Sequence, residues 1–73
     1  MNEEERIKFM QYMIETKIKE IKEKQQKFII YLPCGEIIAD DYKFWEVLSE
    51  NMDLYKNGTW IATVKIWAIT KIS

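Results

Sequence analysis

Hydrophobic residues recur at spacings of three and four along the first third of the chain, and this pattern predicts a long helix over residues 3–25. The apolar stripe consists of Ile7, Met10, Ile14, Ile18 and Ile21. Asn2 stands three positions before Glu5, a spacing typical of a helix N-cap, and lysines gather toward the carboxyl end as the helix dipole favours. We interpret the segment as a helix lying on a sheet rather than a coiled coil, since Lys17 interrupts the heptad pattern.

The next segment has the composition of a hairpin. Residues 28–32 are β-branched or aromatic, Pro33-Cys34-Gly35 is typical of a turn, and residues 36–38 resume a strand. We therefore predict a β-hairpin over residues 27–38.

A second, shorter helix is predicted over residues 41–51, capped by Asp40 or Asp41, with Phe44, Trp45 and Leu48 on its buried face. Residues 52–56 fit two structures. They either end this helix, with Asn57-Gly58 as its C-cap, or form a strand that Asn57-Gly58 joins to the next one. We favour the hairpin because of the segment that follows.

Residues 59–73 contain no Gly or Pro and alternate with period two, which predicts one strand or a bent pair of strands. A straight strand of this length would span about 50 Å, far more than the short strands before it. Its edge would then lack partners within the monomer. Because an unpaired apolar edge is a template for pairing, we expect residues 64–72 to pair with a second copy or with a target protein.

These elements place the chain in the α+β class. The order is α-β-β-α-β-β or α-β-β-α-β, with a long N-terminal helix and a shorter central helix on a small antiparallel sheet of three or four strands. With 73 residues, the chain forms a single small domain, residues 1–73, with a thin core.

Composition excludes most catalytic sites. The chain has no His and one Cys, so imidazole bases, disulfides within the chain and structural zinc sites are excluded. Pro33, Gly35 and Gly58 are too few for a phosphate-binding loop. Cys34, at a predicted turn, has no cation beside it to activate its thiol. We expect no enzymatic activity, no cofactor and no metal.

No apolar run is long enough for a membrane span, and the polar start does not resemble a signal peptide. The single thiol fits a reducing cytoplasm. Twelve Ile and ten Lys against one Arg match the residue usage of an AT-rich genome.

Several residues are candidates for a contact surface. By parity Trp60 and Trp67 lie on opposite faces of one strand; Trp60 shares a face with Val64 and Ile66, so we expect Trp60 in the core and Trp67 at the surface. Aromatic residues are enriched at binding hot spots. Residues 28–57 carry a net charge of −4, from six acidic and two basic side chains, which suits a basic partner. Glu46 and Glu50 would share the outer face of the central helix. The candidate partner-binding residues are Phe9, Tyr12, Glu46, Glu50, Asp53, Lys65, Trp67, Ile69 and Lys71.

We therefore predict a non-enzymatic protein-binding module that self-associates through the C-terminal strand. The most specific hypothesis is a small phage or mobile-element inhibitor that occludes a host defence or nucleic-acid-handling protein in the host cytoplasm. One alternative is a homo-oligomer that sequesters a nucleotide-like ligand, with anion contacts from Lys65 and Lys71. Another is a nucleic-acid-binding regulator using Lys17, Lys19, Lys22, Lys24 and Lys27, but interleaved glutamates weaken that footprint, so direct nucleic-acid binding is not favoured.

Overall fold

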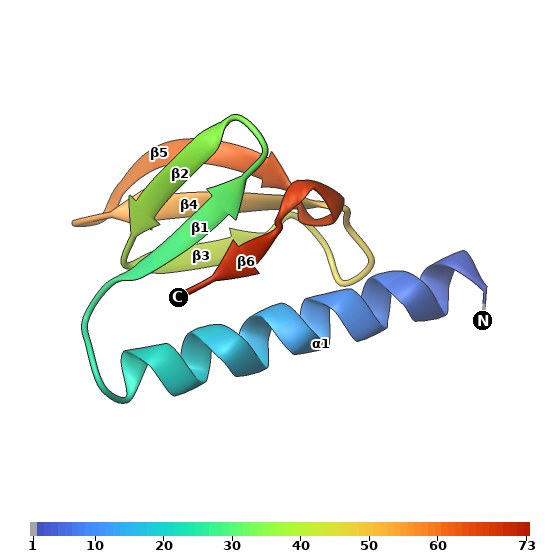
Figure 1. The fold of residues 1–73 in the computed structure, drawn as a ribbon. Coiled ribbons are helices and arrows are strands. Elements are labelled where there is room, and N and C mark those ends of the chain that lie inside the picture. The colour runs from blue at the N-terminus through green and yellow to red at the C-terminus, as the bar shows by residue number, and fades with distance from the viewer. Residues whose placement is uncertain (1) are drawn as a thin grey trace.

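The computed structural model describes residues 2–73, in which one long helix precedes six strands (Figure 1). The α+β class is confirmed. The elements are α1 (Glu3–Lys22), β1 (Phe28–Leu32), β2 (Gly35–Ala39), β3 (Asp41–Phe44), β4 (Asn51–Lys56), β5 (Thr59–Lys65), the 3-10 turn η1 (Ile66–Ala68) and β6 (Lys71–Ile72).

The strands form two antiparallel sheets of three strands each, ordered β2-β1-β6 and β3-β4-β5, where a single sheet was predicted. The chain crosses from the first sheet to the second at Asp40, between β2 and β3, and returns through η1 to β6. Sheets joined by strands that bend at corners pack around a shared core. The first sheet is therefore completed by β6, from the far end of the chain, whereas the second sheet consists of three consecutive strands.

Helix α1 begins where the sequence predicts, because the Glu5 N–H donates to Asn2 Oδ1 at 2.8 Å. It ends at Lys22, three residues before the predicted end, and runs beneath both sheets (Figure 1). Its buried face is formed by Ile7, Gln11, Ile14 and Ile18. No helix within residues 2–73 is long and apolar enough to cross a lipid bilayer.

One hydrophobic core lies between α1 and the two sheets. Phe28, Ile30, Met52, Leu54 and Ile66 have no exposed surface. Every second residue of β1 and β4 points into this core, as expected for strands with one buried face. The second sheet therefore turns its other face, which carries Asp53, away from the core.

The predicted central helix over 41–51 is wrong. Residues 41–44 form β3, residues 45–50 form a loop, and residues 51–56 form β4. Phe44, Leu48 and Met52 are spaced by four, which satisfies a strand period of two as well as a helical period, so the pattern alone did not distinguish the two structures. Of the two structures considered for 52–56, the strand is correct.

Both predicted hairpins are present. β1 and β2 pair through Pro33 and Cys34, and β4 and β5 through Asn57 and Gly58. Asn57 and Gly58 have φ values of 53° and 79°. Positive φ at both central residues is the hairpin turn that Asn-Gly favours.

The C-terminal segment is a bent pair of strands rather than one long strand. It leaves the second sheet at Lys65, makes one 3-10 turn and joins the first sheet, where Ile72 pairs with Ile30 and Lys71 with Tyr31. The expectation that the whole edge of 64–72 lacks a partner is therefore wrong for β6. β5, with β4 on one side, remains an edge strand of the second sheet.

Candidate functional site

All three tryptophans are exposed. Trp45, Trp60 and Trp67 leave 56%, 55% and 41% of their surface accessible. Surface exposure was expected for Trp67 alone, and the expected core positions of Trp45 and Trp60 are wrong. Tryptophan is highly buried on average, so three exposed indoles in so small a domain mark a surface suited to contact.

Two local features bring Trp45 and Trp60 to the surface. Trp45 follows β3 directly, at a position the incorrect helix would have turned inward. At Trp60 a β-bulge shifts the register: Leu54 pairs with Ala62, but its neighbour Tyr55 pairs with Trp60. One extra residue in a strand moves the residues beyond it to the other face. Trp60 and Val64 are four positions apart, an even spacing that predicts the same face of a regular strand, but the bulge between them places Trp60 on the opposite face.

Asp53 joins the two tryptophans on the outer face of the second sheet. Trp45 Nε1 donates to Asp53 Oδ1 at 3.0 Å. Trp60 Nε1 is shared between Asp53 Oδ1 at 3.3 Å and Thr63 Oγ1 at 3.1 Å. The Thr63 hydroxyl also donates to Asp53 Oδ1. We call Trp45, Asp53, Trp60 and Thr63 the Asp53 cluster.

The donors of the Asp53 cluster favour the ionised carboxylate. Hydrogen bonds from Thr63 and then Trp45 lower the pKa of Asp53 below its ordinary value of 3.8, against a smaller opposing effect of burial. The hydrogen bond from Trp60 and the charge of Lys43 lower this pKa further. The cluster therefore presents a fixed negative charge between two indole rings.

A second cluster lies around η1. Trp67 Nε1 donates to Glu50 Oε1 at 3.0 Å, and the Arg6 guanidinium carbon lies 5.3 Å from the centroid of the Trp67 ring. This distance is within the range of a cation–π contact. We call Arg6, Glu50 and Trp67 the Trp67 cluster. Its three residues come from α1, the loop before β4 and η1.

The loop over residues 45–50 is attached to α1 by Gln11. The buried amide Nε2 of Gln11 donates to the carbonyl oxygens of Ser49 at 2.8 Å and Glu46 at 3.3 Å. Trp45 N–H, at the start of the loop, donates to Asn51 O at 3.2 Å. Gln11 therefore helps to position the loop that carries Trp45, Glu46 and Glu50.

The other predicted contact residues do not form one surface. Phe9 and Tyr12 are exposed on α1, and Ile69 is packed against the core. Lys65 ends β5 in the second sheet, whereas Lys71 lies in the first sheet with its Nζ 5.5 Å from the Tyr31 ring. Lys65 and Lys71 are on different sheets, which weakens the idea that they hold one anion together.

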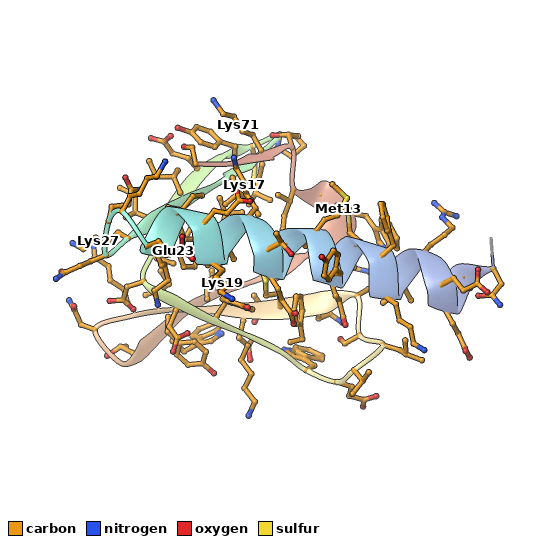
Figure 2. The ribbon with its side chains drawn as sticks, turned by 90° about the horizontal axis from the view of Figure 1, so that it is seen from below. Met13, Lys17, Lys19, Glu23, Lys27 and Lys71 are labelled. Atoms are coloured by element: carbon orange, nitrogen blue, oxygen red, sulfur yellow. The ribbon has the colours of Figure 1, made fainter. Side chains whose placement is uncertain are left out.

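The lysines of α1 are spread around the helix. Figure 2 shows Lys17 on the side of α1 toward Lys71 and Lys19 on the opposite side, with Glu23 near the carboxyl end. Nucleic-acid binding relies on cations gathered on one face. The arrangement does not favour that alternative.

Open grooves lie beside α1, and two of them exceed 300 Å³ in volume. One groove, of about 560 Å³, includes Tyr42 in its lining. Burial raises the pKa of the Tyr42 hydroxyl above its ordinary value of 10.0, and the charges of Glu15 and Asp41 raise this pKa further. The other, of about 330 Å³, lies between Met10 and Met13 of α1 and the segment 69–72. The lining of neither groove includes a tryptophan.

Sequence reasoning identified Asp53, Glu50 and Trp67 but missed Trp45, Trp60, Thr63 and Arg6. The missed members are joined to the others by pairings across strands and by a bulge, which have no signature in spacing along the chain. The count of three tryptophans in 73 residues was the available signal. Comparisons with protein-family models, with curated proteins and with solved structures each returned no match.

Proposed function

We propose that the protein is a non-catalytic protein-binding module whose contact surface is the Asp53 cluster. The observation that carries this proposal is the hydrogen bonding of two exposed indoles to one carboxylate. Rings held in place before binding lose little conformational freedom in a complex, and tryptophan dominates binding hot spots.

The charge around the cluster favours a basic partner. Asp41 and Asp53 lie on the outer face of the second sheet and Glu46 and Glu50 in the adjoining loop, against Lys43 and Lys65. Complementary charge speeds association and selects among partners. A basic groove that normally receives nucleic acid is a target of this kind, so we propose an inhibitor that occludes a nucleic-acid-handling or defence protein.

Affinity capture from a host lysate, followed by measurement of the dissociation constant for the captured protein, tests this proposal. The double variant Trp45→Ala/Trp60→Ala should weaken binding at least 30-fold, because a hot-spot residue contributes about 2 kcal/mol or more. The matched control is Phe9→Ala/Tyr12→Ala, which removes two exposed aromatic side chains from α1. A partner that is lost with the control and kept by the tryptophan variant would place the contact on the helix and contradict the proposal.

A further inference from the structure

The Trp67 cluster contains its own cation. The guanidinium of Arg6 lies over the Trp67 ring, whose N–H donates to Glu50. A cation over an indole face is attracted by the ring quadrupole, and a carboxylate bonded to the ring edge adds a second attraction for positive charge. The protein thus pairs an arginine with an indole and a carboxylate within its own structure.

The Asp53 cluster repeats two of these three components. Trp45 and Trp60 are both exposed and both donate their indole N–H to Asp53, as Trp67 does to Glu50. All the donors in the cluster reach Oδ1, which leaves Oδ2 as the oxygen available to an incoming donor. From this correspondence we infer that the Asp53 cluster binds an arginine side chain of the partner protein, stacked on an indole and directed at Asp53. This inference rests on the proposed function and specifies the chemistry of its partner.

Arginine fits this surface better than lysine. Its guanidinium is planar, stacks on aromatic rings and sheds water more readily than an ammonium group. Lys43 lies directly across from Asp53 on β3 and lowers the pKa of that carboxyl, so any incoming cation meets a partly compensated charge and the charge alone does not select between arginine and lysine. The exposed indole faces of Trp45 and Trp60 then supply the part of the attraction that distinguishes a flat cation.

The three indole N–H groups give separate NMR signals that report on both clusters. The protein labelled with ¹⁵N is titrated with N-acetyl-arginine amide, with N-acetyl-lysine amide and with N-acetyl-citrulline amide, which keeps the shape of arginine without its charge. Single Trp→Phe variants assign the signals. Arginine should shift the signals of Trp45 and Trp60 in a saturable way, lysine should bind more weakly, and citrulline should have no saturable effect. Removing either ring should weaken arginine binding about two- to fivefold, as expected for an exposed cation–π contact.

The variant Arg6→Ala is the matched control. With Arg6 in place the Trp67 signal should respond little to added arginine, and in the variant it should respond as those of Trp45 and Trp60 do. Asp53→Asn should remove the response at Trp45 and Trp60 and leave that of Trp67 unchanged.

Equal responses to arginine and citrulline, or to arginine and lysine, would overturn the inference, as would no shift at Trp45 and Trp60. If the captured partner still depends on Trp45 and Trp60 while these signals ignore arginine, the inference fails and the proposed binding function stands. If neither measurement responds to the tryptophans, both fail.

Discussion

Asp53 controls the position of the exposed aromatic surface. Without an acceptor, the indole N–H groups of Trp45 and Trp60 would bond to water and their rings would sample several rotamers. With Asp53 ionised, both rings are tied to one point on a sheet whose other face is in the core. A single carboxylate therefore determines whether this surface is ordered before a partner arrives.

Acid should release the two tryptophans. Because the pKa of Asp53 is lower in the folded protein than its ordinary value of 3.8, its contribution to stability is complete above about pH 4 and disappears as the pH falls through the folded pKa. The indole N–H signals of Trp45 and Trp60 should shift together with a midpoint below 3.8 in an NMR titration. Thr63→Val should raise that midpoint, because Thr63 is the largest cause of the lowered pKa. A midpoint at or above 3.8 in the wild-type protein would contradict the hydrogen-bond arrangement.

Alkali should act on Tyr42. Its pKa is raised above 10.0, so the folded state resists ionisation that the unfolded state accepts. The stabilising contribution is then present below pH 10 and is lost as the pH rises through the folded pKa. Thermal unfolding followed between pH 9 and pH 11 should show this loss, and Tyr42→Phe should reduce it. Equal loss in both proteins would assign the effect to other groups.

At the scale of elements, a segment could be predicted from the sequence when its pattern of hydrophobic and turn residues fits only one type of secondary structure. α1 and both hairpins follow from signals with one interpretation: a cap at Asn2, a stripe of isoleucines, and turn residues at fixed positions. Residues 41–52 satisfy two periods at once, and the loop between β3 and β4 contains no Gly or Pro to mark it. Pairing of β3 with β4 and hydrogen bonds between the loop and α1, rather than local preference, hold this segment in its structure.

Gln11 makes the hydrogen bonds between α1 and the loop over residues 45–50. Gln11→Ala leaves the carbonyl oxygens of Glu46 and Ser49 without their buried donor, so we expect a loss of about 1–3 kcal/mol in the free energy of unfolding by urea. Gln25→Ala is the control, because its side chain is exposed and donates only to Lys27 O nearby. Its effect should be within about 0.5 kcal/mol. Equal values for the two variants would show that the loop does not depend on α1.

The turn between β4 and β5 tests the hairpin directly. Gly58→Ala places a Cβ on a residue with φ of 79°, which should cost about 1 kcal/mol in the free energy of unfolding. Asn57→Gly is the matched control, since glycine accepts the φ of 53° found at Asn57. This variant should change the free energy of unfolding by only about 0.3 kcal/mol. A tolerated Gly58→Ala would contradict this turn geometry.

At the scale of the whole molecule, the return of the C-terminal segment from the second sheet to the first could not be predicted from the sequence. The run from Thr59 to Ser73 alternates without a break, yet it divides at Ile66 because β1, far away in the chain, accepts β6 as a partner. A 3-10 turn without Gly or Pro leaves no mark in the alternation. Because β6 pairs with β1, part of the apolar segment that suggested pairing between copies has a partner within the chain. The longer free edge left in this segment is that of β5, since β6 has only two residues.

Self-association therefore stays a prediction for β5 alone. Ile66 N–H donates to Glu50 O, so the alternating ladder directs the N–H of its neighbour Lys65 away from β4, toward the open edge. Two copies can pair through this edge about a two-fold axis, and the bulge at Trp60 limits the straight part to a few residues, so the dimer should be weak. Lys65 has φ of −84°, close to the value that proline requires.

Sedimentation velocity over a wide range of protein concentration should detect a reversible dimer of the wild-type protein. Lys65→Pro should abolish it by removing the edge donor while leaving the pairing of β4 and β5 intact. Lys71→Ala is the control, because β6 pairs with β1 and offers only two residues at its own edge. A wild-type protein that stays monomeric at every concentration would exclude this pairing. A dimer that survives Lys65→Pro would place the interface elsewhere, and the exposed residues Phe9 and Tyr12 of α1 would then be the next surface to test.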